Sequence, residues 1–448
     1  EMQRSLVGSE MCIRDSYFDE EGNAWTYNKS TDSYYLHYFS RKQPDLNWEN
    51  PEVRQEIFDM MRFWFDKGID GFRMDSISLI AKDPSFPLID SKKYPDIFSF
   101  YAKEPRLHLY LHEMNRQVLS KYDCMSVGEG SAVMVDDVAK FVDPAREELN
   151  MLYHFDAARI RNTTLPDNPE SGIDYSLIAL KKMFTEWDKA VDKGWPSIYL
   201  GNHDQPRMVS RFGSDKDEFR ALSAKMLITF LLTMRGTPYW FAGDEIGMRN
   251  IRFDRIEDYN DIDTINRYKK AKAEGKDPQA VLDEQKETGR DNARIPFQWD
   301  RSPEAGFTAG TPWLKVNPDY TWINVADEEK DPTSILNYFK KVVSFRKENP
   351  SLIYGSYHLL DAENPQSYTF LRKTGADTYL IMLNFSPKAA ISTPGIDMSN
   401  AHVLLDNYGD RSHMAPQKDI TLRPFEAIVF QLNHPVYESF IDSLDLLE

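Results

Sequence analysis

Apolar and polar positions between residues 50 and 68, NPEVRQEIFDMMRFWFDKG, follow the period of an amphipathic helix. The apolar stripe of this segment consists of Ile57, Met60, Met61 and Trp64. Asn50 is a favourable N-cap, Pro51 suits the first helical position, and Gly68 favours termination. The pattern therefore predicts a helix that begins at Pro51, ends near Gly68 and buries the stripe.

Strand-like runs follow at intervals, each separated from the next by helical sequence. The runs are IDGFRMD (69–75), CMSVGEG (124–130), LNMLYHFDA (149–157), SIYLGNHD (197–204) and TPYWFAGDEIG (237–247). Repeated strand and helix units of this kind predict an α/β domain with a parallel sheet, either open or closed into a barrel. A final helix is predicted near residues 333–348, and the clustered charges at 254–288 indicate a solvated helical excursion.

Beyond residue 355 the pattern changes to that of antiparallel strands. SYTFLRKTGADTYLIMLNFS contains two alternating runs around Thr374-Gly375-Ala376-Asp377, which is typical of a hairpin, and ITLRPFEAIVFQL is also rich in strand formers. We therefore predict a separate C-terminal antiparallel β-sandwich over residues 356–434, followed by a tail over 435–448.

The first residues of the chain read differently from all that follows. In one reading frame, codons for Leu6 to Asp15 spell a nucleotide string that resembles a transposon-end sequencing adaptor. We therefore expect residues 1–16 to be a library artefact, and we exclude them from the interpretation of the fold.

Composition and charge narrow the classes of function. The 448 residues are 41% hydrophobic, enough for more than one domain, and no apolar run reaches the length of a membrane helix. The formal net charge of −17 argues against nucleic acid or an anionic membrane as partner. Outside the expected artefact Cys124 is the only cysteine, which excludes a disulfide framework. We expect a monomer in the cytoplasm.

Three carboxylates follow predicted strands: Asp75 in GFRMD, Glu129 in SVGEG and Asp204 in GNHDQPR. In a barrel of parallel strands such positions converge on one face, where active sites of this architecture lie. An acidic residue after a strand is also a common helix cap or solvated loop charge. Arg73, on the same strand face as Asp75, and His203, directly before Asp204, favour a catalytic interpretation because a cap requires neither.

Other chemically suggestive residues are better explained by structure. His37 lies among aromatic residues in YYLHYF, where a lone histidine is more often structural than a ligand. Trp25, Trp48 and Trp299 could stack on a ligand, but we predict that each packs in the core. The sequence contains no cysteine and histidine cluster of the kind that binds a transition metal, so no metal site is predicted.

Five segments together resemble the motif set of a known family. QPDLNWENPEVR, DGFRMDSI, SVGEG, NHDQPRMVSRFG and GRDNARIPFQWD are similar, in this order, to the α-amylase superfamily, glycoside hydrolase family 13, in its oligo-1,6-glucosidase and α-glucosidase branch. The resemblance runs from about residue 24 to 432. It implies a (β/α)8 barrel and a retaining glycosidase that removes terminal glucose from short α-gluco-oligosaccharides.

The resemblance also implies roles for the strand-end residues. Asp75 would be the nucleophile, kept ionised by Arg73, and Glu129 the acid and base, which requires a raised pKa in a less polar setting. Asp204 would stabilise the distorted sugar ring. His203 and Arg290, or less favourably Arg294, would bind its hydroxyl groups.

Linkage preference is predicted to depend on Ser76, which follows the proposed nucleophile. In this branch the position resembles valine in 1,6-cleaving enzymes and threonine in 1,4-cleaving ones, because it borders the leaving-group subsite. Serine matches neither. Its hydroxyl is closer to threonine in polarity, which favours mixed or 1,4-preferring activity.

The chain departs from the family pattern at its N-terminal side. An Asp-x-x-x-Asn-His stretch and an acidic calcium loop are not found before QPDLN. We therefore expect a truncated barrel that lacks its first three strands, with residues 17–45 a remnant of the inserted domain B and residues 46–355 carrying strands 4 to 8. No cofactor is expected, since the calcium loop would lie in the missing part.

Other functions of the same superfamily stay open. A trehalose-6-phosphate hydrolase and a glucan-transferring or sucrose-isomerising enzyme share the motifs, and non-catalytic members share the fold. The non-catalytic members lose the carboxylate set, whereas Asp75, Glu129 and Asp204 are all present here. This difference favours an enzyme.

Overall fold

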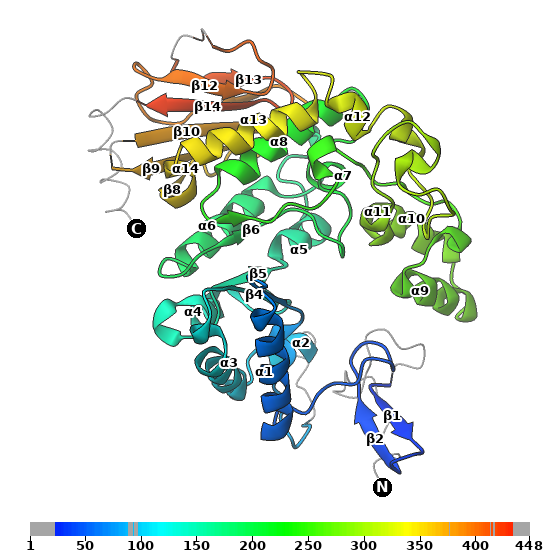
Figure 1. Ribbon diagram of the computed structural model, residues 1–448. Helices are drawn as coiled ribbons and strands as arrows, with labels where there is room; N and C mark the ends of the chain where they lie inside the picture. Colours follow the sequence, from blue (N-terminus) through cyan, green and yellow to red (C-terminus); the bar gives the residue numbers. More distant parts are fainter. Residues whose placement is uncertain are drawn as a thin grey trace. The chain divides into compact units, whose positions relative to one another are not determined.

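The structure is a computed structural model that describes residues 23–87, 93, 97–375, 377–412, 414 and 417–432. The expected artefact at 1–16 and the tail at 435–448 lie outside the described residues. The chain divides into two compact units, and each is described by itself: residues 1–155 with 190–196, and residues 156–189 with 197–448 (Figure 1).

The first unit contains short strands alternating with helices. Its elements are β1 (Trp25–Asn28), β2 (Ser33–Leu36), α1 (Pro51–Asp66), β3 (Gly71–Met74), α2 (Ile97–Tyr101), α3 (Pro105–Gln117), β4 (Met125–Gly130), α4 (Ala139–Val142) and β5 (Met151–His154). The order agrees with the predicted alternation. Strands β3, β4 and β5 form one sheet in that order, and both pairings are parallel as predicted.

Helix α1 begins and ends as the sequence indicates. The Asn50 side chain accepts the Glu52 N–H at 2.9 Å, Pro51 is the first helical residue, and Gly68 has a φ of 94° just beyond the end. The predicted buried stripe is partly wrong. Met60 and Trp64 are 46% and 45% exposed.

The face of α1 that is buried carries Phe58, Met61 and Phe65. Seven of the nine residues from 57 to 65 are apolar, so more than one face satisfies the helical period. Packing selects one of them: the Phe65 ring lies 4.5 Å from that of Tyr122 and 5.0 Å from that of Phe72 on β3.

Strand β3 approaches β4 closely at its first residue. A Cβ on Gly71 would lie 2.0 Å from the Met125 carbonyl oxygen, so the sheet requires glycine at this position. In the register of this pair Arg73 lies beside Val127, and in the next pair Glu129 on β4 lies beside Tyr153 on β5.

The β1–β2 hairpin packs on a small aromatic core, and His37 is structural as predicted. His37 is fully buried, and its Nε2 lies 2.8 Å from the Thr26 hydroxyl. Trp48 is buried, while Trp25 is half-buried with its ring 5.2 Å from that of Phe86. In the second unit Trp299 is 51% exposed, which contradicts the prediction of core packing.

The exposure of Trp299 follows from the extended backbone around it. The neighbouring Gln298 is fully buried, and its amide donates to Asp319 Oδ1 at 3.0 Å and to the Ile323 carbonyl at 2.6 Å. Alternation along the segment then turns Trp299 to the surface, where its ring contacts Phe297 at 4.5 Å.

The second unit contains the remaining helices and strands. Its helices are α5 (Asp156–Thr163), α6 (Leu177–Ala190), α7 (Met208–Phe212), α8 (Arg220–Thr233), α9 (Ile262–Ala273), α10 (Pro278–Thr288), α11 (Asp291–Arg294), α12 (Val325–Glu328), α13 (Ile335–Glu348) and α14 (Ser351–Tyr354). Its strands are β6 (Ser197–Ile198), β7 (Thr237–Pro238), β8 (Ser356–Leu360), β9 (Ser367–Thr374), β10 (Asp377–Asn384), β11 (Ala390–Ser392), β12 (His402–Asp406), β13 (Ile420–Leu422) and β14 (Ala427–Leu432).

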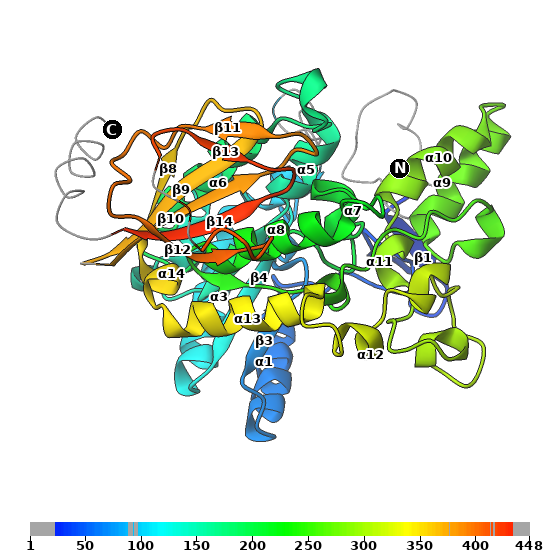
Figure 2. The same cartoon turned by 90° about the horizontal axis from the view of Figure 1, so that it is seen from above.

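Strands β6 and β7 pair in parallel, as predicted, over two residues each. Helices α9 and α10 form the predicted excursion. Helix α8 is buried on nearly all sides and lies alongside α13 and against β10 and β14 (Figure 2). Within the described part of the chain, no helix has both the length and the apolarity needed to cross a membrane.

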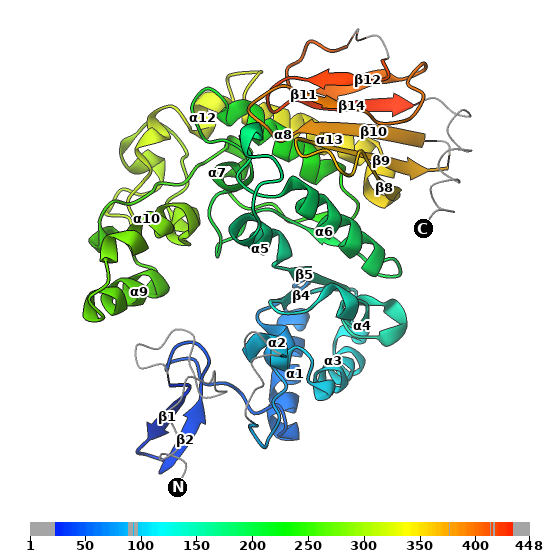
Figure 3. The same cartoon turned by 180° about the vertical axis from the view of Figure 1, so that it is seen from behind.

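Antiparallel strands form the C-terminal part of this unit. Five of them are ordered β12-β14-β10-β9-β8, and β11 pairs with β13 in a second, two-stranded sheet (Figure 3). The predicted hairpin is confirmed, since Thr374 pairs with Asp377. Side chains of both sheets share one core, for example Leu380 from β10 and Ile420 from β13. The predicted sandwich is therefore present.

Buried cations connect these strands to the helices that precede them in sequence. The fully buried Arg372 on β9 donates to the carbonyls of Thr233, Leu352 and Gly355 at 2.6–2.9 Å. Arg346 on α13 also donates to the Leu352 carbonyl, at 2.9 Å.

Lys181 on α6 makes a third connection. Its ammonium group donates to the carbonyls of Asp361, Asn364 and Ser367 at 2.8–3.2 Å, and its side chain is fully buried. These backbone acceptors satisfy cations that would otherwise be costly to bury.

Candidate active site

In the first unit, the end of β3 brings together three residues that the sequence singled out. Arg73 donates through Nη1 to Asp75 Oδ1, and through Nη2 to Glu129 Oε2 at 2.7 Å. One guanidinium group therefore bridges the two carboxylates. The bridge forms because β3 and β4 are adjacent and parallel, so that their C-terminal ends coincide.

The two carboxyl groups differ in their access to solvent. The Asp75 side chain is 73% exposed, whereas that of Glu129 is 10% exposed. Besides Arg73, Glu129 accepts the Ser76 N–H at 3.1 Å and the Ser131 hydroxyl at 3.1 Å. The Ser76 backbone has a φ of 46°, and this left-handed turn directs its N–H to Glu129.

The environment of Glu129 favours its protonated form. Burial raises the pKa of Glu129 and the neighbouring Asp75 carboxylate raises it further, while the Ser76 N–H and Arg73 act in the opposite direction. The net result is a pKa above the ordinary value for glutamate, which agrees with the sequence prediction. A buried carboxyl that keeps its proton beside an exposed carboxylate can serve as a general acid.

Tyr153 belongs to the same cluster, and the sequence analysis missed it. Its hydroxyl accepts the Arg73 Nε–H at 2.9 Å and also a bond from Nη2. Burial, followed by the charge of Glu129, raises the pKa of this hydroxyl, so it stays protonated. The available signal was its place near the end of a predicted strand, in LNMLYHFDA.

In the second unit, Asp204 is surrounded by the other predicted residues. Its Oδ1 accepts from Arg294 Nη2 at 2.7 Å and from Arg290 Nη1 at 3.4 Å. His203 Nε2 lies 3.2 Å from Asp204 Oδ2, and the His203 carbonyl accepts from Arg294 Nε at 2.8 Å. Arg294 thus contacts Asp204 more closely than Arg290 does.

The main partner of Arg290 is Asp261, the N-cap of α9. Burial works against the charge of Arg290, but pairing with Asp261 outweighs it and raises the pKa of the guanidinium. Asp291 holds the same loop by accepting the backbone N–H groups of Asn260 and Asp261 at 2.7 and 2.8 Å. The charged excursion therefore supports the arginine loop rather than being only a solvated surface.

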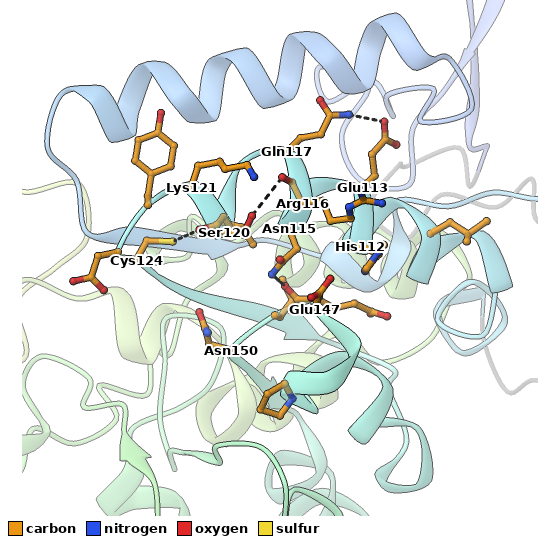
Figure 4. A pocket seen from close by; sticks show the side chains of 17 residues that line it. His112, Glu113, Asn115, Arg116, Gln117, Ser120, Lys121, Cys124, Glu147 and Asn150 are labelled. Carbon is orange, nitrogen blue, oxygen red and sulfur yellow. Dashed lines mark hydrogen bonds between the residues drawn. The ribbon is translucent and has the colours of Figure 1, made fainter.

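A separate hollow of about 930 Å³ lies at the other end of β4 and β5 in the first unit (Figure 4). Cys124 and Asn150, which directly precede these strands, line it together with α3 residues. Its polar groups largely bond to one another: the Gln117 amide donates to Glu113, and the Asn115 amide donates to the Glu148 carbonyl. None of the predicted catalytic residues lies in it.

Within the described ranges, no group of three or more histidine, cysteine or acidic residues is placed to hold a metal ion. The two clusters described above offer carboxylates, arginines, the Tyr153 hydroxyl and the His203 imidazole.

These features define a class of protein: an α/β catalytic domain whose charged residues follow parallel strands, with an antiparallel C-terminal sheet. A model of the alpha amylase catalytic domain matches residues 12–355. The oligo-1,6-glucosidases of Parageobacillus thermoglucosidasius and Bacillus cereus are 47% and 44% identical to this chain, over 92% of it and 74% of their own length. The chain belongs to the α-amylase family.

Solved structures agree with this assignment. The isomaltulose synthase of Protaminobacter rubrum matches with a TM-score of 0.86 at 37% identity. The match covers 94% of this chain and 75% of that chain.

Proposed function

We propose that this protein is a retaining α-glucosidase that removes terminal glucose from short α-linked gluco-oligosaccharides. The observation that carries the proposal is the Arg73 bridge between an exposed Asp75 and a buried Glu129 of raised pKa. A retaining glycosidase needs such a pair, one carboxylate as nucleophile and one carboxylic acid as proton donor. The oligo-1,6-glucosidase relatives support the same reaction class.

In the first step, Asp75 attacks the anomeric carbon of the terminal glucose. The bond between this carbon and the glycosidic oxygen breaks, and Glu129 gives its proton to the departing oxygen. Arg73 keeps Asp75 ionised, because its positive charge favours the carboxylate form. The products are a glucosyl ester on Asp75 and the shortened saccharide.

In the second step, the now ionised Glu129 accepts a proton from a water molecule, whose oxygen attacks the anomeric carbon. The ester bond to Asp75 breaks, and glucose leaves with its original anomeric configuration. The proton that Glu129 gains restores its starting state. Carboxyl groups perform both steps, so no cofactor is proposed.

The cluster around Asp204 is proposed to bind sugar hydroxyl groups. Asp204 and His203 offer acceptors and donors side by side, and Arg294 and Arg290 fix the Asp204 carboxylate. Of the two arginines, the shorter contact now favours Arg294 as the one that orients Asp204. Charged hydrogen bonds of this kind are the strong ones in sugar recognition.

Both 1,4- and 1,6-linked disaccharides are proposed as substrates. The relatives' names point to 1,6-linkages, while Ser76 at the proposed leaving-group side resembles neither branch. We further propose a monomer in the cytoplasm, consistent with the acidic composition and the scarcity of cysteine.

Hydrolysis of a panel tests the proposal: maltose, isomaltose, sucrose, trehalose and trehalose 6-phosphate, with products followed by proton NMR. We expect glucose to be released first as the α-anomer, from maltose and isomaltose alike. Release of β-glucose would contradict the retaining mechanism. Exclusive cleavage of trehalose 6-phosphate would replace the proposed substrate class, and conversion of sucrose to an isomer would favour the activity of the isomaltulose synthase relative.

A further inference from the structure

Tyr153 on β5 contacts the Arg73 guanidinium that bridges Asp75 and Glu129. In the parallel register it lies directly beside Glu129 on β4. Its hydroxyl receives two donors of the Arg73 guanidinium, Nε at 2.9 Å and Nη2. The guanidinium carbon also lies 5.5 Å from the centre of the Tyr153 ring.

These contacts distribute the donors of Arg73 among three acceptors. Nη1 is directed to Asp75, Nη2 is shared between Glu129 and Tyr153, and Nε is directed to Tyr153. Guanidinium donors form a rigid planar fork, so fixing Nε and Nη2 on one side determines where Nη1 points. The tyrosine hydroxyl is therefore the contact that sets the rotation of the fork.

We propose that Tyr153 is a positioning residue whose hydroxyl holds the Arg73 guanidinium in the orientation that bridges Asp75 and Glu129. The proposal rests on the roles given to these two carboxyl groups above. Tyr153 acts through Arg73, and no contact of Tyr153 with a sugar is required.

Without the Tyr153 hydroxyl, the Arg73 guanidinium should move away from Glu129 and toward Asp75. The Asp75 side chain is 73% exposed, whereas Glu129 is buried, so a freed cation gains more hydration on the Asp75 side. Among the described residues, the ionisable groups that face Glu129 are Arg73, Asp75 and Tyr153. Of these Arg73 is the cation, and its departure should leave Glu129 protonated to a higher pH.

The test compares Tyr153→Phe with Tyr122→Phe. Tyr122 is also half-buried in the first unit, and its hydroxyl donates to the charged Asp66 at 2.9 Å, away from the bridge. For Tyr153→Phe we expect kcat/KM on an α-glucoside to fall roughly ten-fold, mainly through kcat, because a charged hydrogen bond is lost. The basic limb of the pH profile should also move upward. Tyr122→Phe should leave both unchanged.

A second measurement does not depend on turnover. A water-soluble carbodiimide modifies protonated carboxyl groups, so mass spectrometry of the Glu129 peptide between about pH 4 and pH 8 reports its protonation. The labelling midpoint should rise in Tyr153→Phe and stay unchanged in Tyr122→Phe. A midpoint and a rate profile that coincide with the wild type, in a variant with normal thermal unfolding, would overturn the proposal. If the wild type cleaves no α-glucoside but Tyr153→Phe still shifts the labelling midpoint, the proposed function is refuted and the positioning role of Tyr153 is not.

Discussion

At the scale of single residues, the two carboxyl groups that Arg73 bridges lie in different surroundings, and we propose a different role for each. The carboxyl group of Asp75 faces solvent and a cation, whereas that of Glu129 is enclosed and shares the same cation. Desolvation favours the protonated form of Glu129. The proposed division between nucleophile and acid therefore depends on the burial of each carboxyl group.

The assigned roles predict different responses to neutralisation. Asp75→Asn should lower kcat by at least roughly a thousand-fold on every substrate, because no nucleophile replaces it. Glu129→Gln should lower it by about a hundred-fold or more on maltose, but spare the first step with an aryl glucoside whose leaving group needs no proton. Azide should then rescue Glu129→Gln and give the α-glucosyl azide. A β-azide would show that the roles are reversed.

The raised pKa of Glu129 also has a cost in stability. In the unfolded chain this group titrates near about 4.3. Above that value the unfolded state has released a proton that the folded state still holds, so the free energy of unfolding falls as pH rises through the window up to the folded pKa. Glu129→Gln abolishes this titration. The difference in Tm between this variant and the wild type, measured by calorimetry, should therefore increase in favour of the variant as pH rises above the unfolded-state pKa. A constant difference would contradict the argument.

The sequence indicated most of the residues of the candidate site, but not which side chains contact one another. Arg73 lies on β3, Asp75 directly follows β3 and Glu129 lies near the end of β4. The sheet brings them together because parallel strands end at one edge. Tyr153 has no charge, and its only signal was its place near the end of a predicted strand. Arg290 and Arg294 are four residues apart on one short turn, and only the fold decides which lies nearer Asp204.

At the scale of elements, the ends of helix α1 were predicted better than the face that it buries. The Asn50 cap and Gly68 stop depend on local backbone chemistry, which the sequence states directly. The buried face of α1 depends on what packs against it, and Met60 and Trp64 were therefore assigned wrongly. Strands β6 and β7 pair over two residues each, although the strand-like runs that contain them are longer.

The close approach of β3 and β4 gives a prediction at this scale. Gly71→Ala would place a methyl group against the Met125 carbonyl, a backbone atom that cannot move aside without shifting the sheet. We expect a loss of about 3 kcal/mol or more in the free energy of unfolding. Gly310→Ala is the control, because its Cβ would meet only Thr308 Oγ1 at 3.8 Å. Equal stabilities of the two variants in urea denaturation would show that the sheet is looser than described.

At the scale of the whole molecule, the sequence pattern divides the chain near residue 355, but hydrogen bonds cross this point. Helix α8 packs on β10 and β14, and Arg372 on β9 donates to carbonyls that precede β8. Long-range contacts of this kind leave no periodic signal. The sequence could therefore predict a change of architecture, but not that the parts on either side of it share buried bonds.

Lys181 offers a test of these shared bonds. Lys181→Met keeps the length of the side chain but leaves three buried carbonyls without their donor, so we expect a loss of about 3 kcal/mol. The neighbouring Lys182 is 74% exposed and pairs loosely with Glu186 at 3.7 Å, so Lys182→Met should change stability by no more than about 0.5 kcal/mol. Chemical denaturation of both variants measures the difference. A harmless Lys181→Met would mean that water replaces the ammonium group.

The arginine contacts at the Leu352 carbonyl restrict how this chain can be recombined. Arg346 and Arg372 come from opposite sides of residue 355 and donate to the same oxygen. A C-terminal sheet grafted from another protein would have to supply an arginine at the place of Arg372, and the recipient would have to present carbonyls in the same places. Otherwise the graft would bury acceptors without donors. The sheet is thus not an exchangeable module, and crossovers near residue 355 should survive only between closely similar parents.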